Sequence, residues 1–183
     1  MLIAPAAKTV KIIRSEDPCN PREDDDGHQG KMICFHGRYR LGDKHDWSNP
    51  NDFHNSKEFR NALVALPLYL YDHSGITMKT TPFSCPWDSG QVGYIYATMK
   101  RYTELTGRKS INKVLKERLR KELENEVKVY DQYLTGDVYD LEIIENGEVV
   151  DTFHCFYGQD WKNNGVMDYL PKELQDKKLW EFV

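Results

Sequence analysis

The chain has 183 residues, of which 30% are charged and 39% hydrophobic, and its formal net charge is −4. This composition excludes a disordered chain and the overall basic character of a dedicated DNA-binding domain. No apolar run approaches the roughly 20 residues of a membrane helix, and the first ten residues lack the basic segment of a signal peptide. We therefore expect a single domain over residues 1–183, located in the cytoplasm and without a membrane partner.

The first third of the chain predicts two strands and one short helix. Alternating apolar side chains indicate strands over residues 8–14 and 31–41. Asn55 or Ser56 is a suitable N-cap for a short helix over residues 57–66, which ends near Pro67.

Residues 15–30 form a turn-rich acidic loop between the two strands. Four of its acidic residues are consecutive, and the last three of them are Asp24, Asp25 and Asp26. Such a run is typical of a solvated loop, and cation binding is the alternative, although the spacing of a calcium-binding loop is missing. We treat the loop as an elaboration of the domain and its three consecutive aspartates as candidates for binding a partner protein.

The stretch from residue 66 to residue 98 holds most of the unusual chemistry. Residues 66–71 and 92–97 alternate as strands that are covered on both faces. Between them lies a long loop rich in Gly, Pro and small polar residues. Long loops carried by rigid strands often contain functional sites.

This loop contains the residue types of a cysteine nucleophile. Cys85 could be activated by His73, and Asp72 or Asp88 could orient the imidazole. No local signature of a known cysteine enzyme accompanies them. The alternative is structural, because Asp and Ser side chains also bond backbone amides in tight loops.

The second half of the chain predicts one long helix followed by a hairpin. Apolar residues recur every three or four positions from Ile111 to Leu134, behind a candidate N-cap at Ser110. Strands before and after Asn146-Gly147 indicate a hairpin with a tight turn. Together these elements predict an α+β fold, with a mostly antiparallel sheet and one long amphipathic helix packed on a face.

Basic residues gather at the start of the long helix. Their excess suggests a nucleic-acid-binding face, and a solvated helix surface is the alternative. The candidates for contacting nucleic acid are Arg108, Lys109, Lys113, Lys116 and Arg120.

The four cysteines are far apart in the sequence, at positions 19, 34, 85 and 155. We expect them to be reduced thiols, because no export signal accompanies them. A zinc site formed by Cys19, Cys34 and nearby histidines would lack the spacing of a zinc finger. We therefore expect no metal and no cofactor.

Aromatic residues give a further indication. Tyr and Trp commonly anchor protein interfaces. Within the central stretch, Tyr71, Trp87 and the neighbouring Gln91 are candidates for contacting a partner protein.

The phrases YDHSGITM, TTPFSCPWDSGQVG and YLTGDVY resemble a family of small proteins from bacteriophages, plasmids and their bacterial hosts. The resemblance covers roughly residues 62–158. Small acidic proteins of mobile elements include many inhibitors of CRISPR or restriction nucleases. The resemblance therefore implies an anti-CRISPR or anti-restriction protein that binds and blocks a host defence nuclease, such as a Cas effector, in the bacterial cytoplasm. A small enzyme using Cys85 and His73, or an accessory nucleic-acid-binding protein, is the alternative.

Overall fold

The computed structural model describes residues 8–23 and 27–183. The chain divides into two compact units. Unit 1 joins Met1–Asn20 with Thr135–Val183, and unit 2 is the continuous segment Pro21–Leu134 between them. Each unit combines a four-stranded sheet with helices, so the expected α+β class is confirmed. The sequence predicts a single domain, which means that the whole chain folds as one unit. Two compact units can still fold together, so the single domain stays a prediction.

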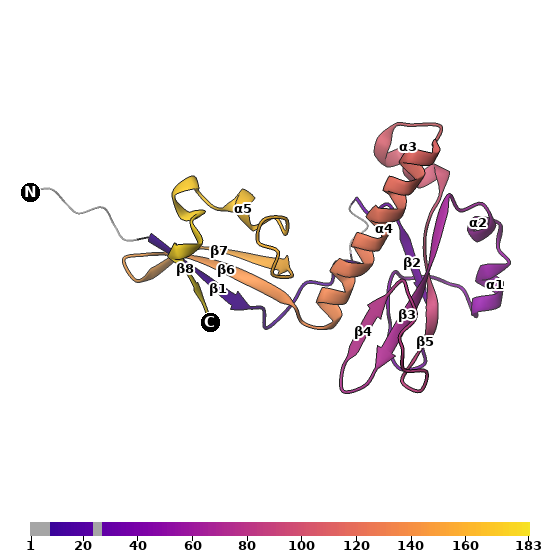
Figure 1. Ribbon diagram of the computed structural model, residues 1–183, viewed down its shortest axis with the longest axis horizontal. Coiled ribbons are helices and arrows are strands. Elements are labelled where there is room, and N and C mark those ends of the chain that lie inside the picture. Colours follow the sequence, from indigo (N-terminus) through magenta and orange to yellow (C-terminus); the bar gives the residue numbers. More distant parts are fainter. Residues whose placement is uncertain (1–7, 24–26) are drawn as a thin grey trace, which may run out of the picture. The chain divides into compact units, whose positions relative to one another are not determined.

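Unit 1 is built on a sheet with the strand order β7-β6-β1-β8 (Figure 1). Strand β1 pairs antiparallel with β6 and parallel with β8. Its elements are β1 (Lys8–Arg14), β6 (Val138–Glu145), β7 (Glu148–Tyr157), α5 (Val166–Tyr169), two short 3-10 helices (Lys172–Leu174 and Lys177–Leu179) and β8 (Trp180–Phe182).

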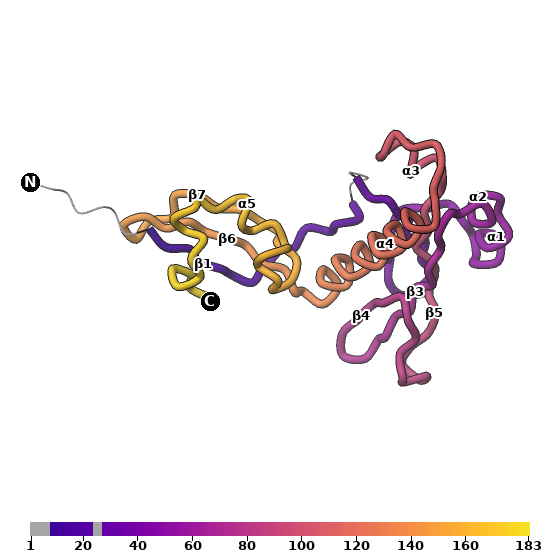
Figure 2. The backbone as a smooth tube through the Cα atoms, turned by 45° about the horizontal axis from the view of Figure 1, so that its top comes forward, coloured from indigo at the N-terminus to yellow at the C-terminus, as the bar shows by residue number. Residues whose placement is uncertain are grey.

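The core of unit 1 lies between one face of this sheet and the C-terminal helical segments, which Figure 2 shows beside the strands. Val10 and Ile12 of β1 pack with Trp161, Val166 and Trp180. The predicted hairpin is confirmed, because Asn146 and Gly147 both adopt positive φ angles in a two-residue turn between β6 and β7.

A disulfide joins Cys19 to Cys155 in unit 1. The two Cα atoms lie 5.8 Å apart although 136 positions separate the residues in the sequence. Nearby, the hydroxyl of Tyr157 donates to the carbonyl oxygen of Cys19 at 2.7 Å. The expectation of four reduced thiols is therefore wrong for these two residues, since the fold brings together segments that the sequence keeps far apart. Cys34 and Cys85 are free.

Unit 2 contains an antiparallel sheet with the strand order β2-β5-β3-β4. Its elements are β2 (Lys31–Cys34), α1 (Pro50–His54), α2 (Lys57–Arg60), β3 (Val64–Asp72), β4 (Ile76–Lys79), β5 (Ser89–Ala97), α3 (Met99–Thr106) and α4 (Lys113–Leu134).

Helix α4 covers one face of the unit 2 sheet, and α1 and α2 lie on the other (Figure 1). The buried side chains of α4 are Leu119, Leu123, Val127 and Tyr130. On the opposite face, Phe53 packs against the aromatic rings of other residues, including Phe59 and Tyr96. Successive side chains of β3 point to opposite faces of the sheet, so alternate residues of this strand pack on each face.

Several sequence expectations for unit 2 differ from the structure. One sheet was expected, whereas the described chain forms two. The stretch expected to be one long loop contains the short strand β4, which lies at the sheet edge beside α4. The helix expected over residues 57–66 ends at Arg60, because Val64 already begins β3. Asn112, not Ser110, accepts a hydrogen bond from the first turn of α4.

A buried arginine ties three segments of unit 2 together. The side chain of Arg22 is only 2% exposed. Its guanidinium donates to both carboxylate oxygens of Asp43, at 2.7 and 2.6 Å, and to Glu126 of α4 at 2.9 Å. It also donates to the carbonyl oxygen of Gly30 at 2.8 Å. Burial alone lowers the pKa of Arg22, but Asp43 and Glu126 outweigh it, so the pKa lies above its ordinary value.

Replacing this arginine tests the network. Arg22→Met leaves two partly buried carboxylates without their cation, so we expect the free energy of unfolding to fall by about 3–5 kcal/mol. Urea unfolding measures the loss. Arg40→Met, at an exposed position, is the control and should change stability by less than about 0.5 kcal/mol. A similar small effect at Arg22 would contradict the role given to the network.

Removing the disulfide tests the link in unit 1. For a flexible loop of this length, the loss of chain entropy in the unfolded state would stabilise the fold by about 5 kcal/mol. Unit 2 makes up most of the loop, and while it stays folded the loop is less flexible, so the bridge contributes less. We therefore expect Cys19→Ser with Cys155→Ser to lower the free energy of unfolding by about 2–4 kcal/mol. Urea unfolding of the oxidised protein is the reference, and Cys85→Ser is the control for losing a thiol. Equal midpoints for the double variant and the reference would contradict this expectation.

Candidate binding site at the loop end of the unit 2 sheet

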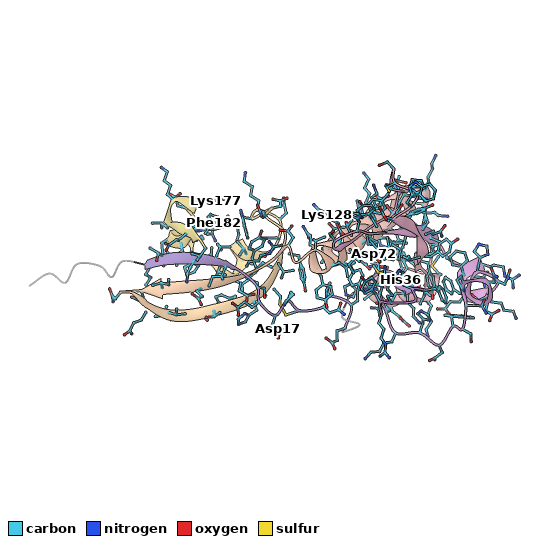
Figure 3. All side chains as sticks on the ribbon, turned by 90° about the horizontal axis from the view of Figure 1, so that it is seen from below. Asp17, His36, Asp72, Lys128, Lys177 and Phe182 are labelled. Carbon is cyan, nitrogen blue, oxygen red and sulfur yellow. A yellow bond between two sulfur atoms is a disulfide. The ribbon has the colours of Figure 1, made fainter. Side chains whose placement is uncertain are left out.

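Three segments meet at one end of the unit 2 sheet. They are the chain leaving β2, the turn between β3 and β4, and the loop that leads into β5 (Figure 2). Arg38 from the first segment forms an ion pair with Asp72 at the end of β3. The amide of Asp72 donates to the carbonyl oxygen of Asp88 in the third segment at 2.8 Å. Figure 3 labels Asp72 and His36 in two of these segments.

We call this group the loop-end cluster. It consists of His36, Arg38, Tyr39, Asp72, His73, Cys85 and Asp88. Within it, the ring of His36 stacks on Tyr39 at 5.1 Å between centroids, and Tyr39 donates to Asp72 at 3.4 Å. The cluster is polar and charged, and hydrogen bonds hold its segments to one another.

The turn between β3 and β4 is tight. Ser74 has a φ of 58° and Gly75 a φ of 150°, and the amide of His73 donates to the carbonyl oxygen of Gly75 at 3.0 Å. Such φ values are easily reached by glycine, which explains Gly75 at this position. The turn projects His73 from the end of the sheet with an exposed side chain.

The residues predicted for nucleophilic catalysis all lie in this cluster, but their arrangement differs from a nucleophile–base pair. The thiol of Cys85 donates to Oδ2 of Asp88 at 3.5 Å, and Nδ1 of His73 lies 3.4 Å from the same oxygen. No hydrogen bond joins Cys85 to His73 among the described residues. A cysteine nucleophile is usually paired with an imidazole or another cationic group. Here the partner of the sulfur is a carboxylate instead, which favours a structural role for Cys85.

The loop before β5 is braced from within. The hydroxyl of Ser89 donates to the carbonyl oxygen of Cys85 at 2.5 Å, and Asp88 bonds both Cys85 and the chain at Asp72. These contacts fix the path of the intervening residues. Trp87 lies between them and is 92% exposed.

Other aromatic side chains accompany Trp87 at this end. The ring of Tyr71 lies 5.6 Å from that of Phe83, and the ammonium of Lys79 lies 4.1 Å above Phe83. Gln91 is exposed on β5, two positions from Ser89, which pairs with Tyr71. Three predicted partner contacts, Tyr71, Trp87 and Gln91, therefore share one end of the sheet. The other three, Asp24, Asp25 and Asp26, lie outside the described residues.

The predicted nucleic-acid contacts lie at the opposite end of the unit 2 sheet (Figure 1). Arg108 and Lys109 belong to the connection between α3 and α4, and Lys113, Lys116 and Arg120 follow on α4. Only Arg120 is half-buried, and it pairs with Glu117 at 3.8 Å. These residues do not join the loop-end cluster, and nucleic-acid binding through them stays a prediction.

The histidines and cysteines considered for zinc do not form one site. Cys19 is in the disulfide, and Cys34 is buried beneath α4. Burial, followed by the charge of Asp43, raises the pKa of Cys34 to about 12. Among residues 8–23 and 27–183, no group of three or more His, Cys, Asp or Glu side chains is placed to hold a metal ion.

Sequence reasoning missed the contribution of Arg38 and Tyr39. The expected strand 31–41 included them, whereas β2 ends at Cys34 and both residues are exposed beyond it. The sequence did contain a signal that the strand ends early. In HGRYR, apolar and polar residues do not alternate, and Gly is typical of a residue that follows a strand.

No protein-family model, curated protein or solved structure matches this chain. Within the described residues, no helix has both the length and the apolar character needed to cross a bilayer.

Thiol labelling tests the two free cysteines. At pH 8 the raised pKa keeps Cys34 protonated, since the pH lies well below about 12, and burial blocks the reagent. We expect native protein to show one thiol reactive with iodoacetamide, lost in Cys85→Ser, and a second only after unfolding. Two thiols that react equally fast in the native protein would contradict this placement. Unusually fast labelling of Cys85 below pH 7 would instead support a catalytic thiol.

Proposed function

We propose that this protein binds and blocks a host defence nuclease, with the loop end of the unit 2 sheet as the contact surface. The observation that carries the proposal is Trp87, which is 92% exposed on a loop braced by hydrogen bonds. An exposed aromatic side chain on an ordered loop offers a large apolar area for a partner to bury. Trp and Tyr are the residues that most often dominate binding energy at protein interfaces.

The free energy available from burying Trp87 supports a binding role. Burying an aromatic side chain removes about 150–250 Å² from water. At about 25 cal/mol per Å², this gives roughly 4–6 kcal/mol before the costs of association are subtracted. The bonds of Ser89 and Asp88 already order the loop. A partner would therefore spend little free energy on fixing its conformation.

The loop-end cluster also offers polar specificity around the aromatic anchor. Arg38 is exposed in its ion pair with the half-buried Asp72. The exposed Gln91 donates from its side-chain amide to the carbonyl oxygen of Gly93, so its own side-chain oxygen is the group offered to a partner. Hydrogen-bonding groups around a central apolar anchor are typical of specific interfaces. The same groups do not make a nucleophilic site, because the thiol of Cys85 faces the carboxylate of Asp88.

The identity of the partner rests on the family resemblance of the sequence. Proteins of mobile elements meet CRISPR and restriction nucleases in the bacterial cytoplasm, and these enzymes bind nucleic acid in basic grooves. Asp24, Asp25 and Asp26 would add negative charge suited to such a groove. The proposed partner is therefore a nuclease with a basic surface next to an apolar pocket.

A protection assay tests this function. Bacteria carrying a panel of CRISPR or restriction systems are challenged with phage while expressing the wild type or a variant. We expect protection to fall at least tenfold in Trp87→Ala, because a central aromatic anchor is lost. Cys85→Ser should protect fully. Val114→Ala, which removes an apolar side chain that is 71% exposed on α4, is the matched control.

Three outcomes would oppose the proposal. Protection that survives Trp87→Ala would remove the loop end as the contact surface. Protection lost in a folded Cys85→Ser variant would indicate an enzyme. Protection that depends on Lys113 and Lys116 instead would move the function to the basic start of α4.

A further inference from the structure

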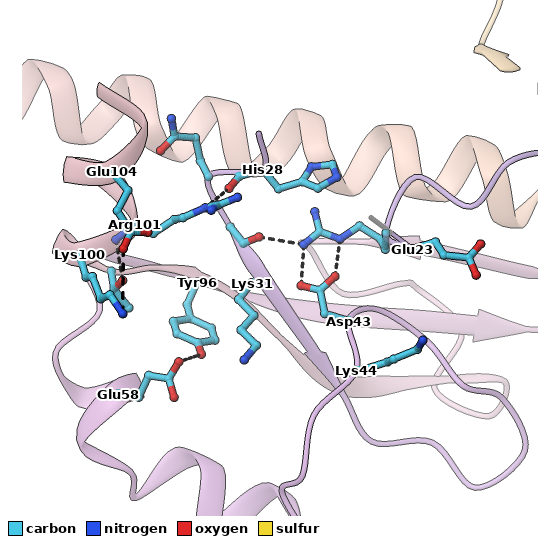
Figure 4. Close-up of a pocket in the computed structure, with 14 residues that line it drawn as sticks. Glu23, His28, Lys31, Asp43, Lys44, Glu58, Tyr96, Lys100, Arg101 and Glu104 are labelled. Atoms are coloured by element: carbon cyan, nitrogen blue, oxygen red, sulfur yellow. Dashed lines mark hydrogen bonds and ion pairs between the residues drawn. The ribbon is translucent and has the colours of Figure 1, made fainter. Parts of the chain in front are cut away.

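A cavity of about 420 Å³ lies in unit 2 beside the start of β2, the end of β5 and the first turn of α3 (Figure 4). Its volume is within the range of small-molecule sites, about 300–1,000 Å³. None of its lining residues belongs to the loop-end cluster. The cavity is therefore a separate feature from the surface proposed to bind a nuclease.

The wall of the cavity is held in place by buried polar contacts. Arg22, fixed by Asp43 and Glu126, forms one part of it. On another side, the hydroxyl of Tyr96 donates to Oε1 of Glu58 at 2.5 Å. Burial and then Glu58 raise the pKa of Tyr96 above its ordinary value, so the hydroxyl stays protonated and keeps donating. A ligand would meet a preformed wall.

Like Lys44, Lys31 is a cation of this wall that has no carboxylate partner among the described residues. It pairs with Tyr96 across β2 and β5, and Figure 4 shows its side chain between the Tyr96–Glu58 pair and Asp43. No carboxylate of the described residues lies within the 4.0 Å limit of an ion pair with it. Lys100 reaches Glu104 only at 4.0 Å. The cavity lining thus contains three lysine ammonium groups, those of Lys31, Lys44 and Lys100, which would attract an anion.

The same cavity presents acceptors for hydroxyl groups. The carboxylates of Glu58 and Glu104 both line it. Only one oxygen of Glu58 is engaged by Tyr96, so lone pairs remain on its carboxylate. In contrast, Tyr96 is almost fully buried and offers no open ring face on which a nucleobase could stack. The lining therefore suits a ligand that has both an anionic group and hydroxyl donors.

We propose that this cavity binds a small phosphate ester of a hydroxylated carbon chain or ring, such as a sugar phosphate. Lys31 and Lys100 donate to the phosphate, because ammonium groups are strong point-charge donors to phosphate oxygens. Glu58 and Glu104 accept from the hydroxyl groups. A free sugar phosphate and the ribose phosphate of a nucleotide share this chemistry.

Titration of the full chain, followed by two-dimensional NMR, tests the site with ribose 5-phosphate, inorganic phosphate, ribose and adenosine 5′-monophosphate. We expect saturable binding of ribose 5-phosphate at least tenfold tighter than binding of phosphate or ribose alone. Lys31→Met should weaken it about tenfold or more, the usual effect of losing a charged hydrogen bond. Glu58→Gln should weaken it severalfold while preserving an acceptor for Tyr96.

Lys128→Met is the matched control, since Lys128 is exposed on α4 and does not line the cavity. Tighter binding of the adenosine nucleotide, with the same dependence on Lys31, would support the site and identify a nucleotide as its ligand. No saturable binding of either ester would overturn the proposal. So would equal affinity for inorganic phosphate, or equal affinity in Lys31→Met and the wild type.

Discussion

The ion pair of Arg22 with Asp43 and Glu126 is the interaction on which unit 2 depends most. It connects the segment that enters the unit, the turn after β2 and the long helix α4. The two carboxylates also bind the backbone around β2. Asp43 accepts a hydrogen bond from the amide of Met32, and Glu126 accepts one from the amide of Gln29. A buried charge persists only when partners satisfy it. The network therefore fixes both the position of α4 on the sheet and one wall of the cavity.

The two functional proposals use opposite ends of the sheet that this network holds. At the loop end, short strands and a tight turn present charged groups and an exposed Trp87. At the other end, the strand register places Lys31 beside Tyr96 over a cavity. At the loop end, the thiol of Cys85 faces the carboxylate of Asp88, and no hydrogen bond joins it to a histidine among the described residues. Both ends of the sheet present preformed donors, acceptors and apolar surface, which suit recognition more directly than covalent chemistry.

The sequence predicts the elements whose signals are local. The hairpin around Asn146-Gly147 and the long helix ending at Leu134 follow from turn chemistry and apolar spacing, and the structure contains both. The pairing of distant segments has no local signal. The division into two sheets and the Cys19–Cys155 bridge therefore could not be read from the sequence. For the same reason, the ion pair between Arg38 and Asp72 was not expected, since 34 positions separate the two residues in the sequence.

The central functional claim is that the protein acts by stoichiometric binding through the loop end. The most direct measurement is the cleavage rate of a purified, sensitive nuclease, titrated with increasing amounts of this protein. We expect cleavage to stop near one molecule of this protein per nuclease. We also expect Trp87→Ala to shift the curve to much higher concentration and Cys85→Ser to leave it unchanged. Loss of cleavage at far less than one equivalent, increasing with time and abolished by Cys85→Ser, would contradict it and establish catalysis.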